Sequence, residues 1–355
     1  MRAMVLRQPR TALTSSEDFA VLELEDVAVP DPSDEEVLVR VSACGVCRTD
    51  LDVAEGRITA PNYPVIPGHQ IVGRVATVGR QVGQYREGDR VGIAWIHSAC
   101  GACRWCASGQ ENLCPHFEST GCDANGGYAE YVTARAAFTY AIPDALSDLE
   151  AAPLLCAGAI GWRSLRLTGI RDGDPLGLTG FGASGHLVLQ LARRRFPHSS
   201  ICVFARSAGE RAFASELGAT WAGDTADAPP EPLAAIIDTT PAWKPVIESL
   251  SHLMPGGRLV VNAIRKTRSD QNELQRLDYA THLWMEREIK SVANVTRADV
   301  REILSFAADT GLRPTVEVIP LEQANAVLAR LRSAVALRGA TVLSVSPTTG
   351  PSLRS

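Results

Sequence analysis

The sequence predicts an α/β protein in which a β-rich domain is joined to a doubly wound parallel sheet. The 355 residues are enough for two domains of ~150 residues each. The first 150 residues contain short alternating segments broken by glycine and proline, whereas the following residues alternate between strand-like and helix-like segments. We therefore expect one domain over residues 1–155 and 295–355, and the parallel sheet over residues 156–294.

Four short segments of the first half are expected to be strands. Apolar and polar residues alternate along them, which is typical of strands with one buried face. The closely spaced glycines and prolines between them favour a compact, barrel-like arrangement. The segments are residues 37–42, 71–79, 88–95 and 126–132.

The second half is expected to open with a strand, a glycine turn and an amphipathic helix from residue 176 onwards. Further strands are predicted over residues 200–205, 234–238, 257–262 and 289–293, with helices over 243–253 and 297–308. This alternation is typical of a parallel sheet with helical crossovers. A last strand over residues 338–345 is expected to return to the first domain, and the tail 346–355 is expected to fray.

The charge balance and the apolar runs limit the partners of the chain. A net charge of −5 argues against nucleic acid, because phosphate binding needs a basic surface. The first residues lack the apolar core of a signal peptide. The longest apolar run, residues 151–162, is shorter than the ~20 residues that cross a bilayer. We therefore expect a cytoplasmic protein without membrane contact, whose nine cysteines are thiols or metal ligands.

Four cysteines lie close together at regular spacing, and we call the segment that holds them, residues 100–114, the cysteine lobe. Cys100, Cys103 and Cys106 occupy every third position, and Cys114 follows. Four thiolates close a tetrahedron around Zn²⁺ and leave no position for a substrate, so such a site is structural. The alternatives are unrelated cysteines or two disulfides, but regular C-x-x-C spacing in a chain without secretory features favours zinc.

Two further motifs of the first half hold possible ligands of a catalytic metal. Cys47 follows the first of the predicted strands, and His69 precedes the next. A catalytic zinc needs three protein ligands and one open position. Each motif alone is weak evidence, since a single histidine before a strand is more often a hydrogen-bonded or surface residue.

The glycine turn of the second half fits a phosphate-binding pattern. Gly180, Gly182 and Gly185 match G-x-G-x-x-G, and Ala183 and Ser184 begin the helix that follows. The first glycine permits the tight turn, the second lets a pyrophosphate approach the backbone, and the third lets helix and strand pack closely. The helix N-terminus then faces the phosphates. Because a strand precedes the turn and another follows the helix, the context favours dinucleotide binding.

The end of the second strand of that half bears on the choice of dinucleotide. An NAD site usually has a carboxylate there, which holds the ribose hydroxyls. This chain has Arg206 and Ser207 instead, which could bind a 2′-phosphate. The pattern favours NADP(H); the alternative is that Arg206 stacks on the adenine of NAD(H).

With these motifs together, the chain resembles the zinc-dependent alcohol dehydrogenases of the medium-chain dehydrogenase/reductase superfamily along nearly its whole length. The resemblance rests on the Cys47–Asp50 run, the Pro-Gly-His69 run, the cysteine lobe, the segment around Cys156 and the glycine turn. It implies a GroES-like catalytic domain beside a Rossmann domain, with the active site in the cleft between them. It also implies a homodimer or homotetramer with two zinc ions per subunit, one catalytic and one structural.

The resemblance further implies a role for each residue of the first motif. Cys47, together with His69 and Cys156, corresponds to the ligands of the catalytic zinc. Arg48 corresponds to a contact of the cofactor pyrophosphate, and Thr49 to the hydroxyl that bonds the alcohol oxygen. Asp50 is expected to orient the zinc ligands from behind. Trp95 corresponds to an aromatic residue of the substrate pocket.

The implied reaction is hydride transfer between an alcohol and NAD(P), or from NAD(P)H to an aldehyde or ketone. Zinc polarises the substrate oxygen, and the cofactor carries the hydride. Two residues depart from the family pattern. Gln70 stands where a glutamate usually follows the ligand histidine, which leaves the site more electropositive. Asp52 stands where many relatives end the proton relay with a histidine, and it could accept that proton.

Two alternatives remain open at this stage. The chain could be a polyol or sugar dehydrogenase of the same fold, or a non-catalytic nucleotide-binding relative. The complete ligand set together with Thr49 argues against the second alternative. The sequence does not identify the small-molecule substrate.

Overall fold

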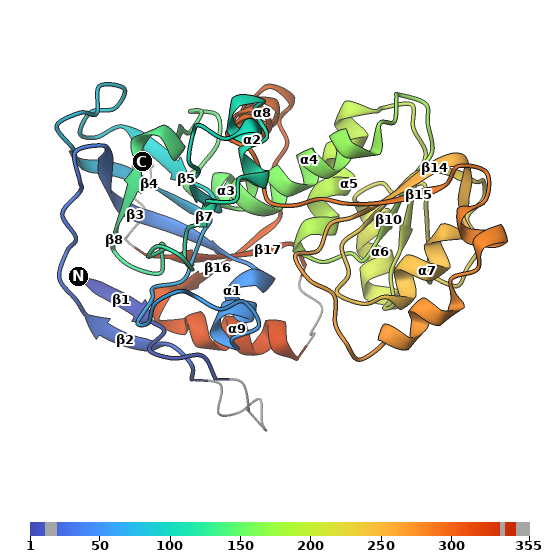
Figure 1. The fold of residues 1–355 in the computed structure, drawn as a ribbon, viewed down its shortest axis with the longest axis horizontal. Helices are drawn as coiled ribbons and strands as arrows, with labels where there is room; N and C mark the ends of the chain where they lie inside the picture. Colours follow the sequence, from blue (N-terminus) through green and yellow to red (C-terminus); the bar gives the residue numbers. More distant parts are fainter. Residues whose placement is uncertain (11–19, 334–337, 346–355) are drawn as a thin grey trace, which may run out of the picture. The chain divides into compact units, whose positions relative to one another are not determined.

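The computed structural model describes residues 1–10, 20–333 and 338–345 of the chain. These residues form two compact units, whose helices and strands are labelled in Figure 1. Of the described residues, the first unit contains 1–10, 20–156, 295–333 and 340–345, and the second contains 157–294 and 338–339. The predicted fraying of the tail 346–355 lies outside the described residues.

The first unit is built around a mixed sheet in the order β16-β17-β3-β4-β5-β9, with β8 paired to β3. Its strands are β1 (Arg2–Val5), β2 (Glu23–Asp26), β3 (Glu36–Val46), β4 (Ile71–Val78), β5 (Arg90–Ile93), β6 (Ile96–Ser98), β7 (Glu118–Ser119), β8 (Tyr131–Arg135), β9 (Thr139–Ala141), β16 (Val316–Pro320) and β17 (Ala340–Ser344). The predicted last strand does return to this unit, since β17 pairs antiparallel with β3.

Helices of the first unit are short except for α8, the first helix after the chain returns from the second unit. They are α1 (Arg48–Ala54), α2 (Arg104–Ala107), α3 (Asp148–Pro153), α8 (Arg297–Thr310) and α9 (Ala324–Arg332), with 3₁₀ turns η1 (Glu111–Leu113), η2 (Ala136–Phe138) and η6 (Leu321–Gln323). Helix α8 begins with a capping box of Thr296 and Asp299 and ends at Gly311, which has a φ of 65°. Both signals are typical of stable helix ends.

The predicted strand over residues 126–132 is wrong for residues 126–130. Strand β8 begins only at Tyr131, and the two glycines before it lie close to other parts of the chain, Gly126 against backbone and Gly127 against the side chain of Ile71. A Cβ at Gly126 would lie 2.0 Å from the carbonyl oxygen of Gly68. The alternation of residue types there reflects this close approach of two chain segments, and not a pleated strand.

The second unit contains the predicted parallel sheet, in the order β12-β11-β10-β13-β14-β15. Its strands are β10 (Leu176–Thr179), β11 (Ile201–Phe204), β12 (Trp221–Gly223), β13 (Leu233–Asp238), β14 (Leu253–Val261) and β15 (Glu288–Ser291), and every pair is parallel. The chain moves outwards from β10 to β12, returns to β13 beside β10 and moves outwards again. Ligands of such sheets bind where the strand order reverses, outside the carboxyl ends of the strands.

Helices of the second unit pack against this sheet (Figure 1). They are α4 (Ala159–Thr168), α5 (Ala183–Arg195), α6 (Ala208–Glu216) and α7 (Lys244–Leu250), followed by η4 (Gln271–Arg276) and the π-turn η5 (Tyr279–Leu283). Val246 and Leu250 of α7 join a buried cluster with Phe204 and Leu259 of the sheet. Within the described residues, no helix is both long enough and apolar enough to cross a bilayer.

Candidate active site

The three predicted ligands of a catalytic zinc come together in the first unit. Cys47 lies between the end of β3 and the start of α1, and His69 lies just before β4. Cys156 belongs to a π-turn, η3 (Leu154–Gly158), that follows α3. One ligand atom from each residue lies within 4.8 Å of the others. Three segments that are far apart in the sequence therefore form one potential metal site, and a π-turn is a frequent feature of such sites.

Asp50 fixes the orientation of this site. Its carboxylate oxygen Oδ1 lies 2.9 Å from Nδ1 of His69, and Oδ2 accepts a 2.7 Å hydrogen bond from the backbone N–H of Cys47. Oδ2 also accepts a bond of 3.1 Å from the hydroxyl of Tyr128. The carboxylate thereby holds the Nδ1 side of the imidazole, as carboxylates behind metal-binding histidines do.

The other nitrogen of His69, Nε2, is buried and has no hydrogen-bond partner among the described residues. Leaving a buried polar atom without a partner is costly, so its presence beside two cysteines points to a ligand. The donor set of two sulfurs and one imidazole nitrogen suits Zn²⁺ and leaves one position open. On these observations, the residues present fit a catalytic zinc.

The electrostatics of the three groups also fit a cation. A hydrogen bond with Cys156 lowers the pKa of Cys47 well below its usual value, while the same bond raises the pKa of Cys156. Burial opposes protonation of His69, but the Asp50 carboxylate and the Cys47 sulfur raise its pKa to about 10. The site thus concentrates negative charge away from water, and metal ligation compensates such charge.

Other predicted site residues surround the three ligands. Thr49 is buried, and its hydroxyl oxygen lies 3.7 Å from the sulfur of Cys47. The ring of Trp95 meets the imidazole of His69 edge to face, with 4.9 Å between the ring centroids. Gln70 is also buried and packs against Gly45, where an added Cβ would lie 3.0 Å from its side chain. Thr49 and Trp95 are therefore in direct contact with the ligands.

Arg48 and Asp52 contact other parts of the first unit. The guanidinium of Arg48 donates a 2.8 Å hydrogen bond to the carbonyl oxygen of Leu331, at the end of α9. The buried carboxylate of Asp52 accepts a 2.6 Å bond from Arg57. Asp52 is thus a fixed, ion-paired carboxylate of α1.

The cysteine lobe also has the geometry of a metal site. One sulfur from each of its four cysteines lies within 4.8 Å of the others. All four are free thiols in the structure, which disfavours the disulfide alternative. Backbone N–H groups point at two of the sulfurs, since Cys103 donates to Cys100 over 3.4 Å and His116 donates to Cys114 over 3.3 Å. Such bonds stabilise thiolates, so the donor set fits a closed zinc site.

Two of the three glycines of the turn after β10 have a steric reason. Gly180 has a φ of 82°, and a Cβ there would lie 2.8 Å from the hydroxyl oxygen of Thr239. A Cβ at Gly185 would lie 2.4 Å from the carbonyl oxygen of Gly180, whereas Gly182 faces open space. The turn is therefore closely packed at Gly180 and Gly185 and open at Gly182. A pyrophosphate bound at the start of α5 requires such an arrangement.

The end of β11 differs in part from the prediction. Arg206 is exposed, as a 2′-phosphate contact requires. Ser207, however, caps α6: its hydroxyl accepts a bond from the backbone N–H of Glu210 and donates one of 3.0 Å to the Glu210 carboxylate. The Ser207 hydroxyl is thus occupied by the helix, and Glu210 places a negative charge next to it. The contacts of Arg206 and Ser207 with a 2′-phosphate therefore stay predictions.

Sequence reasoning missed two residues that support these sites. Tyr128 is fully buried and bonds Asp50, but only the fold brings its segment to α1. Glu111 lies between the third and fourth cysteines of the lobe and accepts two 3.0 Å bonds from Arg297 at the start of α8. No local pattern links residues 186 positions apart, so neither contact could be found from spacing.

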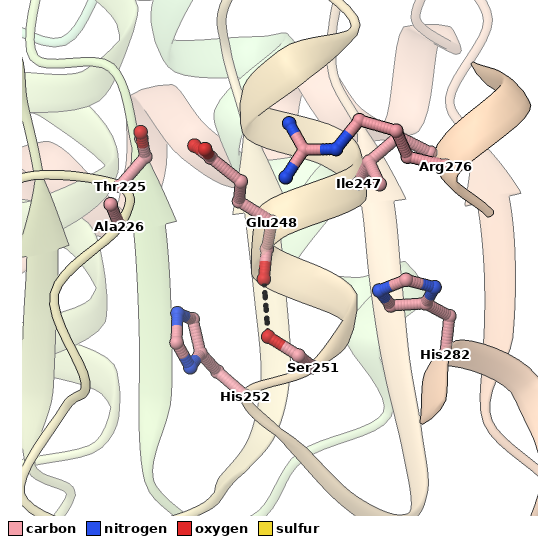
Figure 2. A pocket seen from close by; sticks show the side chains of 8 residues that line it. All are labelled: Thr225, Ala226, Ile247, Glu248, Ser251, His252, Arg276 and His282. Carbon is pink, nitrogen blue, oxygen red and sulfur yellow. Dashed lines mark hydrogen bonds between the residues drawn. The ribbon is translucent and has the colours of Figure 1, made fainter. Parts of the chain in front are cut away.

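A polar cavity lies elsewhere in the second unit (Figure 2). It has a volume of about 240 Å³ and includes Glu248, His252 and His282 among its lining residues. It contains neither the ligands of the first unit nor the glycine turn. None of the predicted site residues is therefore part of this cavity.

Comparisons with known proteins agree with this arrangement. Residues 33–144 match the family model described as the alcohol dehydrogenase GroES-like domain. A probable alcohol dehydrogenase, AdhA, of Mycobacterium tuberculosis (strain CDC 1551 / Oshkosh) is 46% identical, over 92% of this chain and 93% of the relative. An alcohol dehydrogenase of Geobacillus stearothermophilus is 36% identical, over 87% of this chain and 92% of the relative.

Solved structures show the same fold. A cinnamyl alcohol dehydrogenase from Sorghum bicolor superposes with a TM-score of 0.82 at 26% identity, covering 97% of both chains. A thermostable alcohol dehydrogenase from Pyrobaculum aerophilum, solved with cobalt and zinc bound, gives a TM-score of 0.83 at 25% identity. That match covers 97% of this chain and 99% of the other.

The fold and these similarities define the class: a GroES-like domain combined with a Rossmann-like parallel sheet. The chain belongs to the alcohol dehydrogenase family. The predicted fold class and family are confirmed, and so is the predicted class of enzyme, an oxidoreductase that interconverts alcohols and carbonyl compounds.

Proposed function

We propose that the chain is a zinc-dependent alcohol dehydrogenase or aldehyde reductase that uses NADP(H) in preference to NAD(H). The observation that carries the proposal is the buried, unpartnered Nε2 of His69 beside the sulfurs of Cys47 and Cys156. Family membership supports the oxidoreductase class, and relatives of known structure include a cobalt- and zinc-bound enzyme. The substrate is a small alcohol or its aldehyde or ketone.

Cys47, His69 and Cys156 would hold a catalytic zinc, and the cysteine lobe would hold a structural one, which gives two zinc ions per chain. Zinc at the first site supplies a Lewis acid for the substrate oxygen. The chain's own residues then orient the substrate and move its proton. Thr49 is suited to hydrogen-bond the alcohol oxygen because its hydroxyl lies beside Cys47. Trp95 forms an apolar wall next to His69.

Asp52 is proposed as the acceptor at the end of the proton relay. It lies three residues after Thr49 on α1, on the buried side of the helix, and Arg57 bonds one of its oxygens. Gln70 leaves the ligand set without the extra carboxylate charge that the family resemblance implies at this position. We propose that this neutral neighbour makes the site more electropositive and favours the alkoxide form of a bound alcohol.

The glycine turn and the start of α5 would bind the pyrophosphate of the nicotinamide cofactor, through Gly180, Gly182, Ala183, Ser184 and Gly185. A bound cofactor supplies or accepts the hydride. Arg48 would contact the same pyrophosphate once it exchanges its bond to Leu331 for a phosphate oxygen. Arg206 would bind the 2′-phosphate, and this contact is the basis for the preference for NADP(H).

The second unit is proposed as the cofactor domain and the first as the catalytic domain, in a homodimer or homotetramer. A panel of primary alcohols, aldehydes and polyols, followed through NAD(P)H absorbance with both cofactors, tests the proposal. We expect a higher kcat/KM with NADPH than with NADH, and Arg206→Ala should reduce this ratio about tenfold or more. A kcat/KM that is higher with NADH in the wild type would contradict the assignment of Arg206 to the 2′-phosphate. Turnover confined to polyols would identify the chain as a polyol dehydrogenase instead.

A further inference from the structure

One buried carboxylate joins three strand ends of the second unit. Asp238 is the last residue of β13 and is completely buried. Its Oδ1 accepts hydrogen bonds of 2.6 Å from the hydroxyl of Thr179, at the end of β10, and 2.7 Å from that of Thr240. Its backbone carbonyl accepts a 2.7 Å bond from the N–H of Asn262, directly after β14. Asp238 therefore fixes the carboxyl edges of β10, β13 and β14 relative to one another.

Lys266 completes this arrangement. Its ammonium group bonds the other oxygen of Asp238 and donates to the carbonyl oxygens of Thr240, at 2.8 Å, and Ala242, at 3.0 Å. The lysine side chain is only 8% exposed, so all three of its donors are used inside the protein. A buried charge pair whose hydrogen bonds are all made holds a loop rigidly. Here it ties the segment after β14, which begins with Asn262, to the segment after β13.

Asn262 is the member of this group whose side chain is left without a partner. The residue is only 8% exposed, and its amide nitrogen Nδ2 makes no hydrogen bond within the part of the chain that the structure describes. An unmade bond of a buried amide costs free energy, so the position is explained best if a ligand supplies the acceptor. Asn262 stands at the carboxyl edge of the sheet, where ligands of parallel sheets bind.

The order of the strands indicates which part of a ligand reaches this edge. A dinucleotide lies across the point where the strand order reverses, with one nucleotide on each half of the sheet. Here the reversal lies between β10 and β13. The half with β10, β11 and β12 carries the glycine turn and Arg206, which would take the pyrophosphate and the adenosine side. The half with β13, β14 and β15 carries Asn262 and would take the other nucleotide.

We infer that the side-chain amide of Asn262 donates a hydrogen bond to the nicotinamide riboside half of the cofactor, and that Asp238 and Lys266 are positioning residues for this contact. The inference rests on the proposed cofactor site and deepens it. Asn262 is thus assigned a direct binding role, while the ion pair acts only through the backbone that carries it. Since the contact is to the nicotinamide side, it is independent of the choice between NADP(H) and NAD(H).

Asn262→Leu is the decisive variant, because leucine has nearly the same size and cannot hydrogen-bond. Binding is measured without substrate, by fluorescence titration of NADPH and by calorimetry of 2′,5′-ADP, which lacks the nicotinamide riboside. NADH and ADP form a parallel pair without the 2′-phosphate. We expect the Kd of the full dinucleotide to rise about tenfold and the Kd of the adenosine fragment to stay within about twofold. The melting temperature should not fall, since the lost amide makes no bond within the described protein.

Arg206→Ala is the matched control on the other half of the sheet, and it should weaken NADPH and 2′,5′-ADP together. Equal losses for dinucleotide and fragment in Asn262→Leu, with a lower melting temperature, would show a purely structural role and overturn the inference. Unchanged Kd values for the dinucleotide and the fragment would overturn the inference as well, because the amide would then hydrogen-bond a buried water and not the cofactor. If the wild type bound neither dinucleotide, the proposed cofactor site itself would fail, which is distinguishable from either result.

Discussion

The two cysteine sites of the first unit use the same chemistry in opposite ways. The cysteine lobe takes four sulfurs from one segment of fifteen residues near the surface, and Cys100 is exposed. The other site takes two sulfurs and one nitrogen from three distant segments, and its histidine is buried. Four sulfurs close a tetrahedron, whereas three ligands leave a position for substrate. The comparison indicates what would distinguish a structural zinc site from a catalytic one. It is the number of ligands and the contacts that orient them, and not the presence of cysteine.

The hydrogen bonds that hold the ligands also differ between the two sites. Around the lobe, backbone N–H groups bond the sulfurs, and Glu111 ties the loop to Arg297 of α8. Around the other site, Asp50 and Tyr128 orient a single imidazole through side-chain bonds. Backbone contacts hold the shape of a loop, whereas the Asp50 contact also sets which histidine nitrogen would face the proposed metal. Substitutions at the two places should therefore affect different quantities.

The largest effect on turnover, apart from loss of a ligand, is expected at Thr49. Thr49→Ala removes the hydroxyl beside Cys47, and kcat should fall by about 10²–10³-fold because the alcohol proton loses its first acceptor. The zinc content should remain that of the wild type. Steady-state kinetics and metal analysis of the same preparation check both statements.

Thr49→Ser is the matched control for this prediction, since serine keeps the hydroxyl. Its kcat should lie within a few-fold of the wild type. If serine were as inactive as alanine, the methyl group and not the hydroxyl would be responsible, and the proton role of Thr49 would have to be given up.

A smaller effect is expected at Asp50. Asp50→Asn keeps the shape but removes the charge that faces His69, and zinc affinity at the three-ligand site should fall about 10- to 100-fold. Competition with a chromophoric chelator measures this affinity, and the zinc of the lobe serves as the internal reference. Tyr128→Phe removes one bond to the same carboxylate and should give a weaker loss of the same kind. Equal loss of both zinc ions would contradict the separation of the sites.

The smallest effect is expected on the side of the lobe. Glu111→Gln weakens the two bonds from Arg297, and unfolding should become easier by roughly 1–2 kcal/mol without a change in kcat. The matched control is Asp34→Asn, which breaks the exposed pair with Arg80 and should cost less than about 1 kcal/mol. Thermal unfolding with activity assays distinguishes the two, and a fall in kcat for Glu111→Gln would mean that the lobe is more than a brace.

Much of this arrangement could be predicted where the relevant residues are neighbours in sequence. The cysteine lobe and the glycine turn are each contained in one segment, so their spacing alone reports their geometry. Cys156 could be joined to Cys47 and His69 only through the family resemblance, because three different segments supply them. The bond between Tyr128 and Asp50 has no sequence signal at all, since it depends on how two loops pack.

The features that sequence reasoning left out have physical reasons as well. The spacing of Ser207 and Glu210 is that of a capping box, and this local signal should have placed the serine at a helix start. The segment before Tyr131 resembles a strand in composition, but Gly126 is required by the nearby backbone of Gly68, and Gly127 by the side chain of Ile71. Asp238 and Lys266 form a pair only because the parallel sheet brings the ends of β13 and β14 together.

The central claim is that the chain has one closed and one open zinc site, and metal counting together with turnover tests it most directly. Zinc per chain and kcat are measured for the wild type, Cys47→Ser and Cys103→Ser. We expect two zinc ions in the wild type. Cys47→Ser should keep the lobe zinc and its melting temperature but lose turnover, whereas Cys103→Ser should lose the lobe zinc and melt earlier. Equal, folding-limited losses in both variants, or a wild type with a single zinc, would contradict the account.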